Sequence, residues 1–450
     1  MTGPLLKQPW LILTLLGFTV VFAASVYDAR RESTVIRQLR RAEIPLSVEE
    51  LKEKYSPEPW EQNGAKFYLE AMTKYRDPEL STWEHLVIAG DLEYEYGHSF
   101  ANEQRDALRA YVAANAETIG LILKAQQCPF TRLPGSRYDI YDNTLRKSRD
   151  LARLVACAAL DAALSGDTET MGEMIEAGLR LHEIMFEGGL LIDALVAKSI
   201  CTIVFESLEH CLYYARPPSD VIYTWLRGLD TNVYTTHHWM GEILKNETTL
   251  YYQMFEFEGL FFDFPTRLYW QRTLLNLALE GTQYNYFIQN GFVLGMNTVI
   301  AASKKNICDL GITPEEKLID AWWAGNSRNS YGVFYGFSNN IRAHIIAGIN
   351  VAQAATARAA LASLLYLEDH GKMPETLEAL TPGYLLLPAY DPFTQNALLR
   401  YRVDDGQAVF YSVGPNKKDD GGKEAERGKS VYEDGDIFFR LPLLEADSNL

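Results

Sequence analysis

Apolar positions recur at helical spacing through most of the chain. The pattern predicts helices over residues 107–124, 151–164, 171–186, 190–214 and 345–367. Two alanine-rich segments joined by Ser165-Gly166-Asp167 are typical of tetratricopeptide-like helical hairpins, although no clean period of about 34 residues follows. Ser47 and Glu50 form a capping box that predicts another helix start. The fold class expected is therefore mainly α, built as an irregular helical array in which such hairpins are an option.

The pattern changes to alternation near the C-terminus. Arg400–Val403 and Val409–Val413 read as strands joined through Asp405-Gly406, a strong hairpin signal. The residues expected to share faces and pack on the long helix are Tyr401 with Val403, and Val409 with Tyr411 and Val413. The chain thus predicts a small α+β C-terminal module with a β-hairpin.

The N-terminus carries an uncharged stretch from Trp10 to Tyr27. Its length suffices to cross about 30 Å of hydrocarbon, and its two aromatic ends suit a membrane interface. The stretch predicts a transmembrane helix that is retained as an anchor. A cleaved signal peptide is the alternative, because Val21-Phe22-Ala23 offers small residues near a cleavage position.

The charges around this stretch bear on its orientation. Five arginines follow it, namely Arg30, Arg31, Arg37, Arg40 and Arg41. The positive-inside rule would keep the body of the protein in the cytoplasm. The resemblance described below favours the opposite side, so we expect a single-pass protein of the inner (cytoplasmic) membrane with an extracytoplasmic body.

Composition and charge remove several classes of function. The chain has 450 residues, of which 47% are hydrophobic, and a formal net charge of −17, which argues against a general nucleic-acid binder. Its five cysteines are irregularly spaced, so no disulfide framework is expected. The histidines are isolated, and no nucleophile elbow, phosphate loop or dinucleotide motif occurs. No catalytic residue is assigned from the sequence, and we do not expect an enzyme.

An acidic loop after the hairpin is the candidate site. Its oxygen-bearing residues are Asn416, Asp419, Asp420, Asp434 and Asp436. Calcium takes six to eight oxygen ligands from carboxylates, amides and carbonyls, and nearby glycines let carbonyls turn inward. These residues predict a structural calcium site. The loop also carries five basic residues that would weaken such a site, and a solvated surface loop is the alternative.

The order of C-terminal motifs matches a known family. Asp369-His370-Gly371-Lys372-Met373-Pro374 is followed by Asp391-Pro392-Phe393, Ser412-Val413-Gly414 and Asp434-Gly435-Asp436-Ile437. This order resembles the soluble domain of the major pseudopilins of type II secretion, whose matching loop binds calcium. The whole chain resembles membrane-anchored helical proteins of planctomycete-type bacteria. The resemblance implies architecture and a calcium loop, and no chemistry.

These observations divide the chain into three parts. Residues 1–28 are the predicted anchor, residues 29–345 an α-helical domain, and residues 346–450 the pseudopilin-like module. The function expected is an extracytoplasmic interaction or scaffold protein that binds the membrane through its anchor and a protein partner through its body. The alternative is a hydrolase or lipid-binding protein with its pocket in the aromatic region 250–290.

Overall fold

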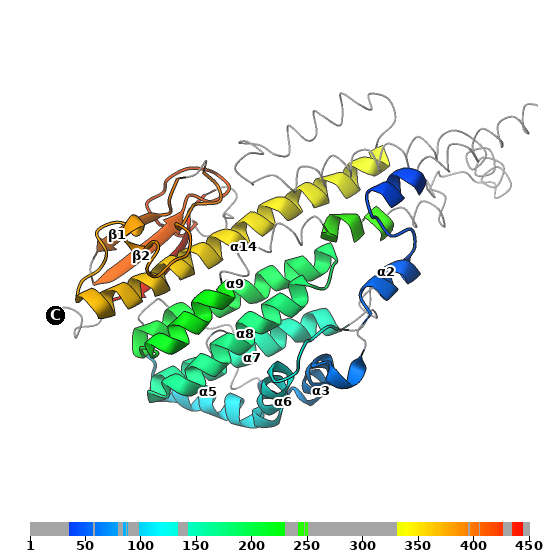
Figure 1. The fold of residues 1–450 in the computed structure, drawn as a ribbon. Coiled ribbons are helices and arrows are strands. Elements are labelled where there is room, and N and C mark those ends of the chain that lie inside the picture. The colour runs from blue at the N-terminus through cyan, green and yellow to red at the C-terminus, as the bar shows by residue number, and fades with distance from the viewer. Residues whose placement is uncertain are drawn as a thin grey trace, which may run out of the picture. The chain divides into compact units, whose positions relative to one another are not determined.

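The computed structural model divides the chain into two compact units, which are described separately. It describes residues 36–56, 59–79, 84–86, 88, 99–133, 143–229, 242–246, 248–250, 331–394, 397–404, 406–425 and 434–443, with only the helix course given for 331–344. Helices make up 62% of these residues, and a small antiparallel sheet lies near the C-terminus (Figure 1). The mainly α prediction is confirmed at this level. The predicted anchor lies outside the described residues.

The first unit contains Met1–Lys54, Leu244–Ala302 and Glu315–Ile341. Its helix α2 covers Val48–Lys54, so the predicted start is confirmed. Ser47 Oγ accepts a bond from the Glu50 N–H at 3.1 Å, while the Glu50 carboxylate accepts from the Leu46 N–H at 3.0 Å. Arg40 also binds this carboxylate through both terminal nitrogens, at 2.7 and 2.9 Å. The helix start is therefore fixed from both ends of the capping box.

The second unit contains Tyr55–Ile243, Ser303–Pro314 and Arg342–Leu450. Its α-helices are α3 (Ala65–Lys74), α5 (Asn102–Ala114), α6 (Ala116–Gln126), α7 (Thr144–Ser165), α8 (Thr168–Phe186), α9 (Leu191–Tyr214) and the part of α14 (Tyr331–His370) that follows Ile341. Two short 3-10 helices, η2 (Trp60–Gln62) and η5 (Leu377–Leu380), lie at either end of this set. The predicted helices are present, but the one expected over 107–124 is divided.

Asn115 causes this division. Its side chain is buried, and it bonds the backbone of Arg76 twice, accepting from the amide at 2.9 Å and donating to the carbonyl at 3.1 Å. Asn115 also leaves helical geometry, with φ −109° and ψ 15°. An asparagine that satisfies a distant backbone in this way favours a break over a continuous helix.

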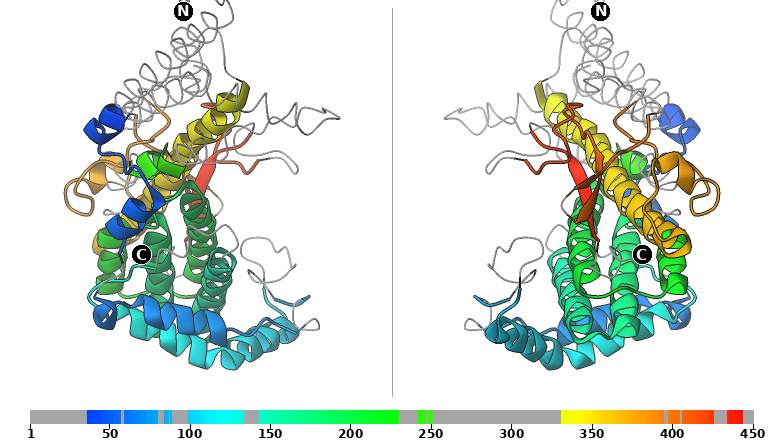
Figure 2. Two further views of the ribbon diagram at one scale, coloured as in Figure 1. Left: turned by 90° about the vertical axis from the view of Figure 1, so that its right-hand side faces the viewer. Right: turned by 90° about the vertical axis from the view of Figure 1, so that its left-hand side faces the viewer.

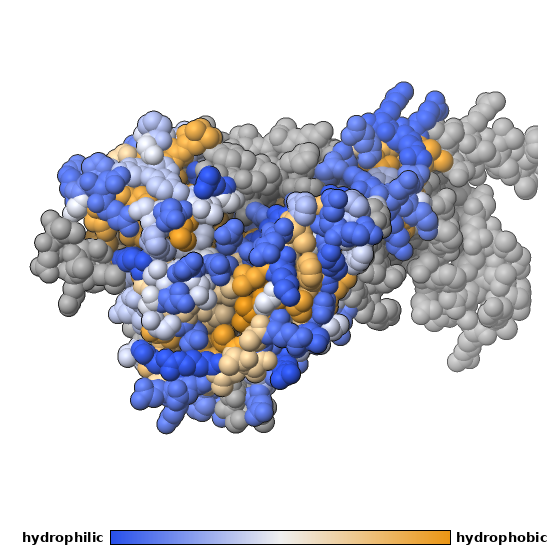
Figure 3. Space-filling model, turned by 60° about the horizontal axis from the view of Figure 1, so that its bottom comes forward, coloured by the Kyte–Doolittle hydropathy of each residue, from blue (hydrophilic) through white to orange (hydrophobic). Residues whose placement is uncertain are grey.

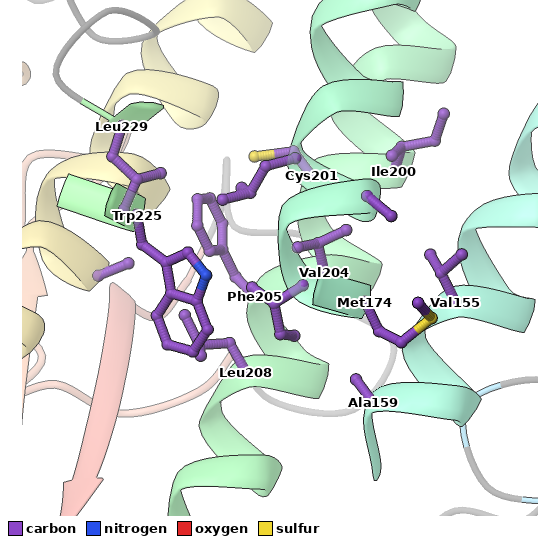
Figure 4. Close-up of a cluster of buried hydrophobic side chains, with 14 of the residues drawn as sticks. Val155, Ala159, Met174, Ile200, Cys201, Val204, Phe205, Leu208, Trp225 and Leu229 are labelled. Atoms are coloured by element: carbon purple, nitrogen blue, oxygen red, sulfur yellow. The ribbon is translucent and has the colours of Figure 1, made fainter. Parts of the chain in front are cut away.

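Helices α7, α8 and α9 form the main hydrophobic layer. Figure 4 shows side chains of all three packed together, with Trp225 and Leu229 of the helical segment 219–229 closing one side. The turn from α7 to α8 uses Gly166 at φ 76°, a left-handed conformation that glycine adopts without strain. Helices α3, α5 and α6 run across this layer and pack on α7 and α8 (Figure 2).

The C-terminal sheet has the order β1-β2-β3, with β1 at Arg400–Asp404, β2 at Gln407–Ser412 and β3 at Ile437–Pro442. All neighbouring strands are antiparallel. The predicted hairpin is confirmed. The third strand is not predicted from the sequence, in which the acidic loop ends at Ile437 and no strand is expected after it.

The sheet faces differ from the prediction. The residues that join the main core are Ala408, Phe410, Phe439 and Leu441, together with Leu361 and Leu364 of α14. Val409 and Tyr411 point to the opposite face, where the loop covers them. A Cβ placed at Gly422 would lie 3.0 Å from a side-chain carbon of each. The loop therefore packs on the sheet, and the prediction that Val409 and Tyr411 face the helix is wrong.

Helix α14 is the main apolar element behind the sheet. Its stretch Ile345–His370 is the one described helix long and apolar enough to cross a membrane, and 83% of its most apolar window is buried in the protein. Burial of this kind is typical of a core helix. In this structure the stretch supports both the sheet and α9, since Gln353 of α14 donates to Thr202 of α9 at 3.1 Å.

Two helical glycines offer a test of this packing. A Cβ at Gly178 of α8 would lie 2.6 Å from the Val204 side chain, whereas one at Gly120 of α6 meets no atom within 4 Å. We expect Gly120→Ala to raise the free energy of unfolding by about 0.5–1 kcal/mol through helix propensity. Gly178→Ala should lower it by about 1–3 kcal/mol because the layer is overpacked. Urea denaturation measures both, and equal effects would show that α8 and α9 do not meet this closely.

Candidate functional site

Asp391 anchors the start of the candidate loop. Its side chain is fully buried. Oδ1 accepts from Ser412 Oγ at 2.7 Å and from the Phe393 N–H at 2.9 Å, and Oδ2 accepts from the Val413 N–H at 3.1 Å. A buried carboxylate is stable when several donors surround it. The Asp391-Pro392-Phe393 motif therefore fixes the exit of β2.

Asp436 closes the other end of the loop. The residue is 4% exposed, and its Oδ2 accepts from the backbone N–H groups of Gly422 at 2.7 Å and Asp420 at 3.1 Å. Its Oδ1 is buried and has no hydrogen-bond partner among the described residues. Burial raises the pKa of this carboxyl above its usual value. One oxygen of Asp436 is thus left in need of a donor or a cation.

Two more predicted ligands lie beside Asp436. Asn416 Nδ2 lies 3.4 Å from Asp420 Oδ2 and 3.5 Å from the carbonyl oxygen of Gly435. Asn416 Oδ1 accepts from the Lys418 N–H at 2.9 Å. The structure therefore brings Asn416, Asp420 and Asp436 together around the backbone of Gly435.

Asp419 faces a different group. Its Oδ2 accepts from Arg400 Nε at 2.7 Å, and the same arginine lies 3.5 Å from Asp391 Oδ2. Arg402 Nε donates to the carbonyl oxygen of Gly421 at 3.1 Å. Arg400 and Arg402 thus bind the loop to β1. In the structure Asp419 forms an ion pair with Arg400.

The remaining predicted ligand, Asp434, begins the described return segment two residues before Asp436. Within the described part of the chain, no three His, Cys, Asp or Glu side chains are arranged as a ready metal site. The groups near Asp436 are the Asp420 carboxylate, the Asn416 amide and the Gly435 carbonyl. That donor set is the one hard cations such as calcium select.

A second cluster, which the sequence did not indicate, links β3 to α9. Glu209 of α9 is buried, and its carboxylate accepts three bonds from Arg440: the backbone N–H at 2.6 Å, Nε at 2.7 Å and Nη2 at 3.3 Å. Burial raises the pKa of Glu209, while the Arg440 cation and its N–H groups oppose that shift. Because 231 positions separate the two residues, no local pattern could have revealed the pair.

The same edge of β3 receives a donor as well. Nη2 of Arg216 donates to the carbonyl oxygen of Pro442. Strand edges carry unpaired N–H and C=O groups, which proteins usually cover. Glu209 near the end of α9 supplies an acceptor, and Arg216 in the segment that follows α9 supplies a donor, so both side chains cover the outer edge of β3.

Two of the histidines considered from the sequence, His182 and His210, are buried in the protein. His182 is buried, and its Nδ1 lies 2.8 Å from the Ala197 carbonyl oxygen. His210 is 9% exposed, and burial together with the Arg440 cation lowers its pKa to about 4. His237-His238 and the aromatic region 251–290 lie outside the described residues.

Comparison of this chain with protein-family models, with curated proteins and with solved structures gave no match. The resemblance to pseudopilins consequently stays a prediction from the motifs.

The low pKa of His210 predicts an acid-sensitive fold. The unfolded histidine binds a proton below a pH of about 6.5, while the folded one resists protonation down to a pH of about 4. Stability from this group is thus present above the unfolded pKa and falls as the pH decreases through that window. We expect His210→Gln to reduce the slope of unfolding free energy against pH by about 1.4 kcal/mol per pH unit within it. Urea titrations at pH 6 and 5 measure this, and parallel curves for both proteins would contradict it.

Proposed function

We propose that this protein is a membrane-tethered, extracytoplasmic interaction protein whose C-terminal module carries a structural calcium site. The observation that supports the site is the buried, unpartnered Oδ1 of Asp436. A buried charged oxygen without a partner is costly, and a bound cation would remove that cost. The loop around it already supplies other oxygens.

The ligands proposed are Asp436, Asp420 and the Gly435 carbonyl. Asn416 would join them after its amide turns over, since its nitrogen now faces Asp420 and its oxygen accepts from Lys418. Asp434 would complete the set after a local adjustment. Asp419 would act through Arg400, which keeps the loop against β1. Calcium would neutralise the carboxylates of Asp420 and Asp436 and would hold the return segment on the sheet. Its role would be mechanical.

An interaction role agrees with how the described helical layer uses its polar groups. Glu209 forms an ion pair, and His182 bonds a backbone carbonyl. Both groups serve packing. The alternative, a hydrolase or lipid-binding pocket in residues 250–290, concerns a region almost wholly outside the described residues and gains no support from them.

Calcium should raise the melting temperature of the full chain, purified in detergent, in a saturable way relative to a chelator control. Asp436→Asn should abolish this rise because it removes the charge that the ion would neutralise. In chelator, the same variant should be at least as stable as the natural protein, since a buried charge is costly. Asp419→Asn is the matched control: it should lower stability modestly through loss of the half-exposed Arg400 pair and keep the calcium response. No shift at millimolar calcium would overturn the site.

The tether is tested separately. Because Trp10–Tyr27 is long enough to span a membrane, the intact chain should stay in the membrane fraction after alkaline carbonate and leave it with detergent. Replacement of Leu15 and Phe18 by Arg should release it. A mature protein that begins after Ala23 by mass spectrometry would establish a cleaved signal peptide instead. Protease digestion of spheroplasts reports the side of the body.

A further inference from the structure

The outer edge of β1 differs from that of β3. Because the strand order is β1-β2-β3, each of these two strands has one neighbour in the described sheet. The side chains of Glu209 and Arg216 cover the edge of β3. The backbone groups that β1 turns toward its own outer edge follow from the ladder of hydrogen bonds.

Hydrogen bonds at β3 answer this. The Arg440 N–H points away from β2, since it bonds Glu209. Backbone groups alternate in an antiparallel ladder, so Val409, the partner of Arg440, turns its N–H and C=O toward β1 and its partner Arg402. Arg402 therefore bonds inward. Tyr401 and Val403, its neighbours, turn their N–H and C=O groups outward.

Residues Ala389 and Tyr390 pair with the chain just before β1, and this pairing ends at Leu399. The Leu399 N–H donates to the Ala389 carbonyl at 2.8 Å, and Tyr390 forms an antiparallel bridge with Leu398. Pro388, which has no N–H, precedes this segment and cannot donate to the ladder. No described residue bonds the outward backbone groups of Tyr401 or Val403.

Apolar side chains gather along the same stretch. The fraction exposed is 46% for Val403 and 48% for Tyr390, and the adjacent Leu386 and Leu387 are 75% and 45% exposed. On the face drawn in Figure 3, apolar side chains form a band near the middle of the described surface, bordered by polar ones. An open strand edge with apolar neighbours is a surface that pairs with another strand.

We propose that β1 of a second copy of this chain occupies this edge. The pairing would be antiparallel about a two-fold axis at Arg402, which joins two three-stranded sheets into one. In this register the outward groups of Tyr401 face those of Val403 in the other copy, so every free N–H and C=O finds a partner. The inference goes beyond the proposed tether and calcium site and requires neither.

The side chains of β1 suit this register. Tyr401 comes opposite Val403 of the other copy, an aromatic–β-branched pair. Arg400 comes opposite Asp404, and this opposite-charge pair would add to the ion pairs that Arg400 forms with Asp419 and Asp404 forms with Arg402 in each chain. The two Arg402 side chains meet at the axis as like charges. Each of them already contacts Asp404 and the Gly421 carbonyl of its own chain, which offsets the repulsion.

The first test is the oligomeric state of the full chain in detergent, measured by sedimentation equilibrium over a range of protein concentrations. We expect a reversible dimer. Val403→Lys, an edge lysine, should weaken dimerisation by about tenfold or more. Ile192→Lys is the matched control, because Ile192 on α9 is 44% exposed and lies outside the sheet. A monomer at all concentrations, or a dimer that both variants weaken equally, would overturn the proposal.

A second test reads the register directly and does not depend on the folding of the lysine variant. Residues at a two-fold axis in a non-bonded pair have Cα atoms about 4.5 Å apart, within disulfide range. Arg402→Cys should therefore form a covalent dimer on mild oxidation, whereas Val403→Cys, which lies opposite Tyr401, should not. The natural protein is oxidised in parallel to account for its own cysteines. Equal cross-linking of both variants would exclude this register.

Discussion

A three-stranded sheet cannot satisfy its own outer backbone groups, and the ion pair between Glu209 and Arg440 meets this need for β3. Glu209 binds both the side chain of Arg440 and the backbone N–H that the strand turns outward. The carboxylate is buried, so loss of either partner would leave an uncompensated charge or a bare N–H. Glu209 at Arg440 and Arg216 at the Pro442 carbonyl therefore hold β3 against the end of α9, while Phe439 and Leu441 pack into the core.

The geometry of the acidic loop depends on where β3 lies. Asp436 is the last residue before β3, and Arg440 is four residues further along the strand. At its other end the loop begins from a turn fixed by Asp391, and Arg400 ties its middle to β1. The three oxygen-bearing residues around Gly435 are thus positioned by strands whose own placement α14 and α9 determine. A metal site here would be held by rigid elements on both sides.

The sequence was sufficient for elements that depend on local patterns. Helical periodicity placed α8 and α9 to within three residues and the end of α7 to within one, although α7 begins seven residues before the predicted start. Gly166 marked the turn between α7 and α8. It was insufficient where distant residues decide. The break at Asn115 depends on the backbone of Arg76, and the role of Asp419 depends on Arg400. Five residues of the acidic loop were candidate ligands from the sequence, because spacing alone does not show which carboxylate pairs with an arginine side chain.

The side chains on the two faces of the sheet account for the packing role of this loop. Ala408 and Phe410 take the side that faces the core, which leaves Val409 and Tyr411 buried on the other side. Those side chains need a cover, and the backbone of Gly422, at φ 72°, approaches both closely enough that no Cβ would fit without a shift. The loop consequently has a packing duty before any ion binds. Arg400 and Arg402 bind the loop to β1, and the backbone N–H groups of Asp420 and Gly422 bind Asp436. A bound cation would further stabilise the packing of the loop on the sheet.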